Sequence, residues 1–218
     1  MRGDGVIALR GPHVSPGYTD PARDAGMFED GWLISGDLGH VDDRGYVHVT
    51  GRAKDVIIRG SHNIDPGLVE DAFLAHPAVA MCAVVGEPDA HSGEVPAAFV
   101  TLKPGASATG NQLLADVAPR VYERPAVPRR VVVLESLPLT AIGKVYKPAL
   151  RARAIEIKLQ ELLSAVPGSP PLRVVAQERG NAFVALVHAG CPREEAIEVH
   201  WRQALGAIAV PVEYRFAA

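Results

Sequence analysis

The stretch "NIDPGLVEDAFLAHPAVAMCAVVG", residues 63–86, shows how one part of the chain folds. Asp65 is placed to cap a helix, and Pro66 follows at the first turn, where a missing N–H costs little. Apolar residues at i, i+4 spacing predict a single packed helix face. These residues are Leu68, Ala72, Val69 and Phe73. The continuous apolar run after the helix predicts a strand.

The next segments repeat this mixture of helix and strand. "EVPAAFVTL" (94–102) predicts a second strand, and "RRVVVLESLP" (129–138) predicts a third. Between them, "NQLLADVAPRVY" (111–122) has Leu113, Leu114, Val117 and Val121 at helical spacing. The order helix, strand, strand, helix, strand predicts a compact α+β unit, which we place at residues 52–150.

The C-terminal part, residues 151–218, predicts a further small unit. A helix over 151–166 has an apolar stripe, and "PGSPP" then breaks the chain. The stripe consists of Ile155, Leu159, Leu162 and Val166. A hairpin over 172–189, with its turn at 178–181, precedes a second helix and a last strand. That helix, 192–208, is marked by Ile197, Trp201 and Leu205, and the strand is 210–216. The order αββαβ predicts a ferredoxin-like extension, and the role of residues 170–218 stays open.

The N-terminal part, residues 1–51, predicts short strands and turns without a helix of any length. "DDRG" (42–45) separates two strand-like runs as a hairpin turn. The first run, "VIALRG", has nothing before it to pair with, so we expect a fragment of a larger domain. Such a piece should have unpaired strand edges and an exposed apolar face.

The composition is that of an ordinary soluble protein: 218 residues, 48% hydrophobic, 22% charged and a net charge of −3. This charge argues against a nucleic-acid surface, which concentrates Lys and Arg. No apolar stretch approaches the ~18 residues of a membrane span, and the start lacks the apolar core of a secretory signal. Cys82 and Cys191 form no CxxC pair, and Cys82 fits a buried thiol, which predicts a cytoplasmic location.

Several stretches together resemble the adenylate-forming superfamily, which includes AMP-forming acyl-CoA synthetases, luciferases and peptide-synthetase adenylation domains. They are "GVIALRGPHVSPGY" (5–18), "GWLISGDLGHVDDRGYVHVTGRAKDVIIRGSHNIDPGLVE" (31–70) and "LPLTAIGKVYKPALR" (137–151). The order and spacing resemble the family from about residue 5 to 151. The resemblance implies that 1–51 closes the N-terminal domain and that 52–150 is the small, mobile α+β C-terminal domain.

The resemblance implies that Lys144 is the catalytic lysine of this superfamily. Adenylation brings a carboxylate against the α-phosphate of ATP, so two anions must approach each other. A long ammonium between them offsets the repulsion and stabilises the transition state. Gly143 leaves the loop free to approach a ligand closely. The alternative is a solvated turn lysine, the commoner state of a lysine.

Three further residues carry implied roles in the nucleotide site and its movement. Asp37 of "SGD" would accept both ribose hydroxyls, and Arg52 would reach the ribose and phosphate region. The family threonine of this motif is Ser35 here, which keeps the hydroxyl. Lys54 matches the hinge position, where a change in φ and ψ rotates the C-terminal domain between two half-reactions. As alternatives, Asp37 is a turn residue, and Arg52 and Lys54 are exposed cations.

Gly60 resembles the loop that lines the CoA channel, where a glycine lets the pantetheine arm pass close to the backbone. We interpret His62 as a loop residue near CoA, and no HExxH, HxH or Cys/His cluster predicts a metal site. ATP with Mg²⁺, CoA and a carboxylic acid are the implied substrates, with no prosthetic group.

The chain lacks a phosphate loop of the "STGTTGxPK" kind, an acyl pocket and a "YGxTE"-type motif. We therefore expect the C-terminal portion of an acid–CoA ligase, inactive alone, which needs an N-terminal adenylation domain in cis or in trans. No carrier-domain serine motif follows residue 151, which favours a CoA ligase over a peptide synthetase. The alternative is a non-catalytic binding or regulatory module. The acyl pocket would choose the acid; a fatty or related acid is our first expectation, and branched or aromatic acids stay open.

Overall fold

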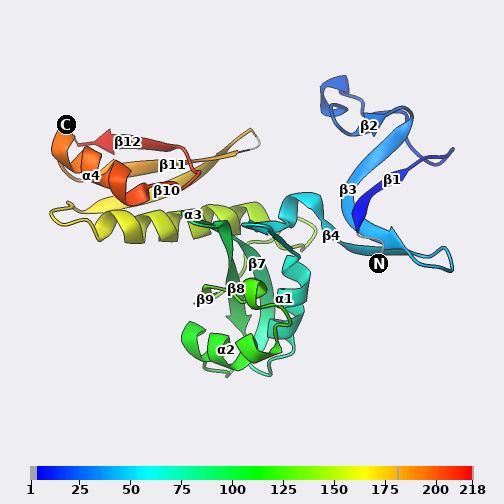
Figure 1. Cartoon of the computed structure of the whole chain (residues 1–218), viewed down its shortest axis with the longest axis horizontal. Coiled ribbons are helices and arrows are strands. Elements are labelled where there is room, and N and C mark those ends of the chain that lie inside the picture. The colour runs from blue at the N-terminus through cyan, green and yellow to red at the C-terminus, as the bar shows by residue number, and fades with distance from the viewer. Residues whose placement is uncertain (1–3, 181, 218) are drawn as a thin grey trace. The chain divides into compact units, whose positions relative to one another are not determined.

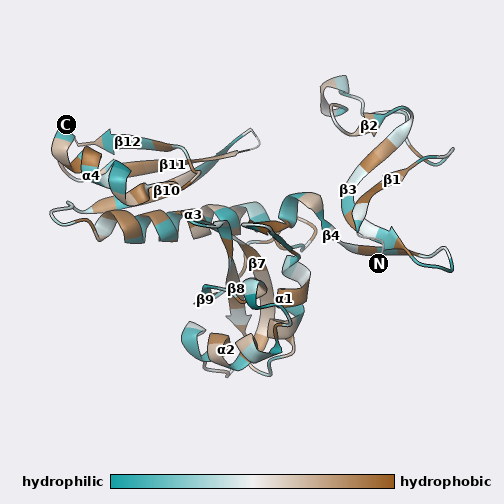
Figure 2. Cartoon of the chain, viewed as in Figure 1, coloured by the Kyte–Doolittle hydropathy of each residue, from teal (hydrophilic) through white to brown (hydrophobic). Residues whose placement is uncertain are grey.

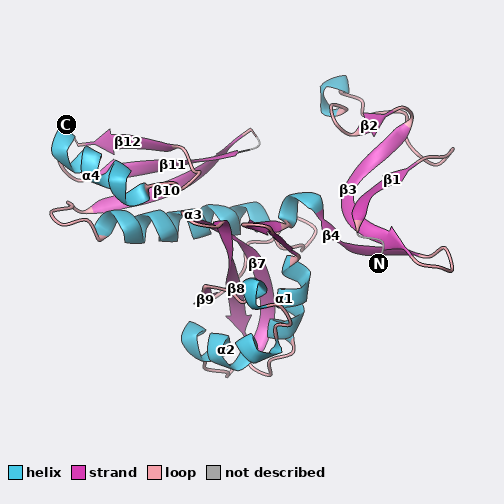
Figure 3. Cartoon of the chain, in the orientation of Figure 1, coloured by secondary structure: helices cyan, strands magenta, loops and turns pink. Residues whose placement is uncertain are grey.

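The computed structural model describes residues 4–180 and 182–217. They form two compact units, divided after Val56, and each unit is described here by itself (Figure 1). The units agree with the predicted α+β class, because their helices accompany sheets in which most strand pairs are antiparallel (Figure 3).

The first unit is a four-stranded antiparallel sheet built around β3. Its strands are β1 (Gly5–Leu9), β2 (Phe28–Glu29), β3 (Trp32–Val41) and β4 (Val47–Arg52). Two 3₁₀ turns, Pro21–Arg23 and Ala53–Asp55, are the only helical segments in its described part, so the predicted β-rich character is confirmed. The predicted turn at 42–45 is also confirmed, because the Gly45 N–H donates to the Asp42 carbonyl at 3.0 Å.

Several large apolar side chains of the first unit are exposed. They include Val6, Trp32, Val41, Val47 and Val49. None of the described residues 4–56 belongs to a buried hydrophobic cluster. Burying such side chains is favourable in water, so their exposure costs this unit part of the usual hydrophobic stabilisation.

The second unit begins with a five-stranded sheet of order β6-β5-β8-β7, in which β9 pairs in parallel with β8. Its strands are β5 (Ile57–Arg59), β6 (His62–Ile64), β7 (Val79–Asp89), β8 (Gly93–Leu102) and β9 (Arg130–Val133). Helices α1 (Pro66–Leu74) and α2 (Gly110–Val117) precede and follow the long β7–β8 hairpin. The sequence prediction missed the β5–β6 hairpin, because strands of three residues are too short to show a period.

The helix cap at the start of α1 is confirmed, since the Gly67 N–H donates to Asp65 Oδ1 at 2.9 Å. Val69 and Phe73 are fully buried, but Leu68 is 68% exposed, so its predicted place on the packed face is wrong. Adjacent helical residues point about 100° apart. Val69 and Phe73 lie on the helix face that packs against the sheet, so Leu68 lies on a side of the helix that is exposed to solvent.

Two other predicted elements are shorter in the structure. The helix predicted to Tyr122 ends at Val117, and Pro119 lies in the 3₁₀ turn that follows. The strand predicted over 129–138 is limited to β9, because only Arg130–Val133 pairs with β8. The apolar residues after β9 belong instead to a loop that leads to α3 (Lys147–Ser164).

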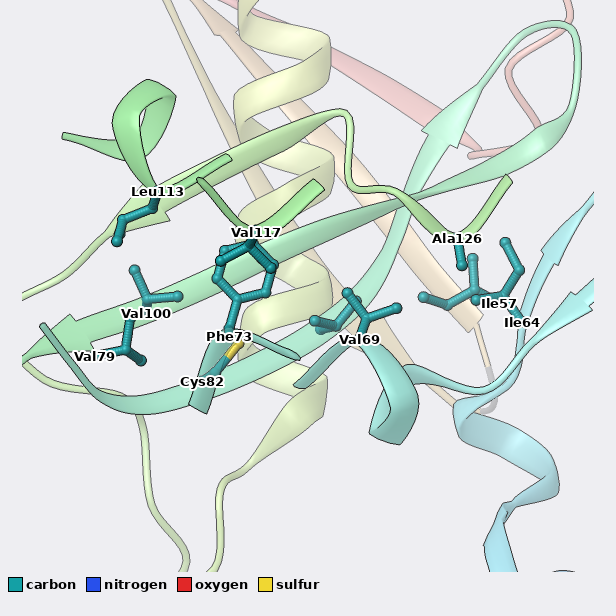
Figure 4. Packing of buried hydrophobic residues seen from close by; sticks show 12 residues of the cluster. Ile57, Ile64, Val69, Phe73, Val79, Cys82, Val100, Leu113, Val117 and Ala126 are labelled. Atoms are coloured by element: carbon teal, nitrogen blue, oxygen red, sulfur yellow. The ribbon is translucent and has the colours of Figure 1, made fainter. Parts of the chain in front are cut away.

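The five-stranded sheet has a hydrophobic core on each face. One core joins the sheet to α1 and α2, with Phe73, Leu113 and Val117 packed over strand residues such as Val100 (Figure 4). The other core places Leu150 and Ala154 of α3 against the opposite face. Cys82 is buried in the first core, as predicted.

Helix α3 is shared with a third core in the extension. This part contains β10 (Leu172–Arg179), β11 (Ala182–Ala189), α4 (Glu195–Leu205) and β12 (Val212–Phe216). The order αββαβ and the β10–β11 hairpin are as predicted, although Asn181 of the predicted turn lies outside the described residues. In the sheet β10-β11-β12, β12 lies next to β11 in parallel, and the ferredoxin-like assignment is not confirmed.

The two sides of α3 enter different cores, and apolar residues recur along its length between polar ones (Figure 2). Of the predicted stripe, Ile155 and Leu159 are buried in the core of the extension, whereas Leu162 is only partly buried. Leu163, which was not part of the predicted stripe, is also buried there. The predicted boundary after Leu150 falls inside this helix. The domain limits 1–51, 52–150 and 151–218 therefore stay predictions.

Candidate functional site

The structure brings together the two residues that were assigned to the ribose. Asp37 of β3 lies directly opposite Arg52 of β4 in the antiparallel register. Arg52 Nε donates to Asp37 Oδ1 at 3.0 Å, and the side chains of Arg52 and Asp37 are 56% and 32% exposed, respectively. The pair is open to solvent, so its carboxylate and guanidinium can reach a polar ligand as well as each other.

Ser35 explains how Asp37 is positioned. Its hydroxyl donates to the Ile7 carbonyl of β1 at 2.8 Å and accepts from the Asp37 N–H at 3.0 Å. Gly36 between them has φ of +74°, a conformation that favours glycine. The Ser35 hydroxyl therefore joins β1 to the backbone of Asp37.

Lys54 lies in the 3₁₀ turn that connects β4 to β5, two residues before the division between the units. Within residues 4–180 and 182–217, its side chain takes part in no hydrogen bond or ion pair. A connecting residue without such contacts can change its φ and ψ at little cost. The hinge role stays a prediction.

Lys144 lies on a tight hairpin that precedes α3. The Gly143 N–H donates to the Thr140 carbonyl at 2.9 Å, and the Thr140 N–H donates to the Lys144 carbonyl at 2.7 Å. The Lys144 N–H in turn donates to Thr140 Oγ1 at 3.1 Å. Gly143 has φ of +77°, which accounts for a glycine at this position. The backbone of Lys144 is thus fixed on both sides.

The Lys144 side chain is exposed and makes no ion pair or hydrogen bond with the described residues. Nearby, Lys147 Nζ lies 2.8 Å from Glu70 Oε1, which also accepts from the Val84 N–H at 2.8 Å. This contact ties the first residue of α3 to α1 and β7. The sequence prediction missed Glu70 and Lys147, although both lie inside the motifs that carried the resemblance.

Cys82 is close to this ion pair, but its thiol is unreactive. Burial raises the pKa of the Cys82 thiol far above its ordinary value, with a smaller contribution from the negative charge of Glu70. The thiol is therefore neutral at physiological pH and is unsuited to act as a nucleophile.

Gly60 lies at a shallow cavity of about 440 Å³. The cavity is lined by Arg59, Gly60, Ser61, His62, Ser92, Arg124 and Pro125. Gly60 has φ of +59°, and its N–H donates to the Ser92 carbonyl at 2.7 Å. Two guanidinium groups beside a hairpin give this cavity a positive character that suits an anionic ligand. The sequence prediction identified Gly60 and His62 but missed Arg124, because it is distant in sequence.

A turn at residues 89–92 contributes Ser92 to the lining of this cavity. Asp89 Oδ1 accepts from the Ser92 hydroxyl at 2.8 Å, the Ser92 N–H at 2.9 Å and the His91 N–H at 3.0 Å. These hydrogen bonds, led by the one from the Ser92 side chain, lower the pKa of Asp89 to about 2. The charged carboxylate therefore fixes Ser92, which in turn fixes the Gly60 hairpin.

The described residues contain no group of three or more His, Cys, Asp or Glu side chains that could hold a metal ion. Within the same residues, no helix is both long and apolar enough to span a membrane. Asp37 and Arg52 belong to the first unit, whereas Gly60 and Lys144 lie on separate loops of the second.

Comparisons with known proteins give a consistent result. Residues 68–144 match the family described as AMP-binding enzyme C-terminal domain. Marinolic acid–CoA ligase of Pseudoalteromonas sp. (strain SANK 73390) is 42% identical over 163 residues, which are 74% of this chain and 25% of that protein. Long-chain-fatty-acid–CoA ligase of Bacillus subtilis (strain 168) is 40% identical over 153 residues, with 70% and 26% covered.

The fold is also similar to solved structures. ATP-bound MatB from Rhodopseudomonas palustris aligns with a TM-score of 0.65 and 36% identity, over 72% of this chain and 31% of that one. The chain therefore spans about a quarter of the length of the curated relatives it matches.

Proposed function

The chain belongs to the AMP-binding, adenylate-forming enzymes, because residues 68–144 match the C-terminal domain of that family. From this premise we propose that the chain is part of an AMP-forming acid–CoA ligase. The reaction has two steps. An acid and ATP give acyl-AMP and pyrophosphate, and acyl-AMP and CoA then give acyl-CoA and AMP. In this proposal the chain supplies the catalytic lysine, the ribose contacts, the hinge and one wall of the CoA channel.

The exposed Lys144 on its fixed hairpin is the observation that carries the proposal. Its ammonium is not engaged by any described residue, so it is available to a ligand. In the first step it would lie between the attacking carboxylate and the α-phosphate and offset the charge that builds up there. A fixed backbone reduces the conformational entropy that is lost when the side chain binds.

Asp37 and Arg52 would hold the ribose of ATP in the first step. The two oxygens of Asp37 can accept both ribose hydroxyls, while Arg52 keeps its contact to the carboxylate and directs its remaining N–H groups towards the nucleotide. Ser35 would act indirectly, because its hydroxyl orients Asp37.

Lys54 and Gly60 would act in the second step. Rotation at Lys54 would exchange the loop of Lys144 for the loop of Gly60 at the acyl-AMP. The cavity beside Gly60, with Arg59 and Arg124, offers cations to the phosphate groups of CoA. Mg²⁺ would enter with ATP, as part of the substrate.

The exposed apolar side chains of the first unit support a protein partner for it, namely an N-terminal adenylation domain in cis or in trans. That domain would carry the phosphate loop and the acyl pocket, and so would choose the acid. Fatty acids are our first expectation, and a cytoplasmic location remains part of the proposal.

A chimera tests the proposal. This chain replaces the matched C-terminal part of the Bacillus subtilis long-chain-fatty-acid–CoA ligase, and both half-reactions are measured with a fatty acid, ATP and CoA. We expect acyl-CoA formation, with loss of the adenylation step in Lys144→Ala. Lys103→Ala, which changes an exposed turn lysine of the same unit, is the matched control. A folded chimera in which Lys144→Ala and Lys103→Ala leave the same adenylation rate would contradict the proposal.

A further inference from the structure

The three-stranded sheet of the extension has two different edges. At the β10 edge, side chains of α3 occupy the backbone groups that a further strand would need. Gln160 Oε1 accepts from the Val174 N–H at 3.0 Å, and Gln160 Nε2 donates to the Leu172 carbonyl at 3.0 Å. Glu156 Oε1 accepts from the Ala176 N–H at 3.1 Å. The β10 edge is therefore closed by its own helix.

The β12 edge is open. The Ala185 N–H donates to the Pro211 carbonyl at 2.9 Å, and the Ala217 N–H donates to the Ala189 carbonyl at 3.2 Å, so the odd-numbered residues of β12 face β11. Because backbone direction alternates along a strand, the N–H and C=O groups between them point away from the sheet. These outward groups belong to Val212, Tyr214 and Phe216. Within residues 4–180 and 182–217, no other segment pairs with them.

The side chains of β12 divide between the two faces of the sheet. Val212, Tyr214 and Phe216 are half-buried against the core, where Trp201 stacks on Tyr214 and Phe216 with ring centroids 5.7 and 6.2 Å apart. Glu213 and Arg215 stand on the opposite, exposed face. The strand thus alternates apolar residues with one acid and one base.

We propose that β12 pairs in antiparallel fashion with β12 of a second copy of this chain, about a twofold axis at Tyr214. In this register Tyr214 lies opposite its own copy, and Val212 lies opposite Phe216. Each of these outward-facing pairs exchanges two main-chain hydrogen bonds. The two sheets become one continuous sheet, which removes the open edge from both copies.

Charge complementarity selects this register and this partner. With the axis at Tyr214, Glu213 of each copy lies opposite Arg215 of the other, at positions without mutual hydrogen bonds, where side chains are closest. An axis at Glu213 or at Arg215 would place like charges opposite each other, which is unfavourable. On this exposed face, Glu213 already contacts Arg179 of β10 at 2.6 Å and lies 3.8 Å from Arg215 of its own strand, so Arg215 of the second copy would join an existing cluster of charges.

The test measures the mass of the full chain by sedimentation velocity over a range of concentrations. We expect a monomer–dimer equilibrium in which Glu213→Arg and Arg215→Glu each raise the dissociation constant by about 10- to 30-fold, because two cross-strand pairs change from attraction to repulsion. An equimolar mixture of the two variants should form a mixed dimer again, since every acid then lies opposite a base.

Arg173→Glu is the matched control, because it makes the same charge change on the sheet but on the far strand β10. We expect it to dimerise like the original chain. Fluorescence of the buried Trp201 verifies that each variant is folded. A single-chain mass at every concentration would overturn the proposal. So would an equal effect of Arg173→Glu, or a mixture of the two variants that stays monomeric.

Discussion

Replacement of Arg130 by Met should strongly destabilise the second unit. Arg130 of β9 contacts Glu87 of β7 through Nε, and its Nη1 and Nη2 lie 2.7 and 2.6 Å from the two oxygens of Glu161 on α3. Glu87 is only 1% exposed, whereas Glu161 is 54% exposed. One guanidinium therefore compensates a buried carboxylate and also ties α3 to the sheet.

The magnitude follows from this difference in burial. Methionine keeps the apolar stem but leaves the carboxylate of Glu87 buried without its cation, which costs about 3–5 kcal/mol. Loss of the exposed partner in Glu161→Gln should cost no more than about 1 kcal/mol. The double replacement Arg130→Met with Glu87→Met removes both buried charges and should recover most of the stability.

Urea unfolding monitored by Trp201 fluorescence measures these differences. The chain has two tryptophans, so a Trp32→Phe background restricts the signal to the second unit. With an m-value of about 2 kcal/mol/M, Arg130→Met should lower the urea midpoint by roughly 1.5–2.5 M. The reasoning is refuted if Arg130→Met costs no more than Glu161→Gln, or if the double replacement is less stable than Arg130→Met alone.

Three further predictions concern the proposed site. In the chimera, Lys144→Ala should lower the adenylation rate by about 10²–10³-fold and affect conversion of supplied acyl-AMP far less, and an equal loss in both steps would contradict the assigned role. Lys54→Pro should spare adenylation and reduce thioester formation, because proline fixes φ at the hinge; unchanged overall turnover would exclude Lys54 from the mechanism. Asp89→Asn should cost about 1–2 kcal/mol at neutral pH, because it weakens the turn below the Gly60 hairpin. The pKa of Asp89 is lowered from 3.8 to about 2 on folding, so this contribution is present above pH 3.8 and disappears as the pH falls through 2. If the stability difference between the original chain and the Asp89→Asn variant stays constant over this range, a charge effect is ruled out.

Local features were predictable from the sequence because they depend on neighbouring residues. The Asp65 cap with Pro66 indicated the start of α1, and apolar spacing indicated α3 and α4. The glycine before Lys144 indicated a special loop, and the structure supplies the reason as its positive φ in a tight hairpin. The motifs that resemble the adenylate-forming enzymes likewise lie in short, continuous stretches.

The rest was decided by tertiary contacts between distant segments. Periodicity indicates which residues share a face, but only the position of the sheet determined that Val69 is buried and Leu68 is exposed. Ion pairs such as Arg130 with Glu87 join strands that no local pattern connects. The open edge of β12 also depends on the whole sheet, because α3 closes the opposite edge with its own side chains. The sequence alone determined most of the longer elements and the candidate residues inside the motifs, whereas long-range packing decided where those elements end and which faces, charges and edges they present.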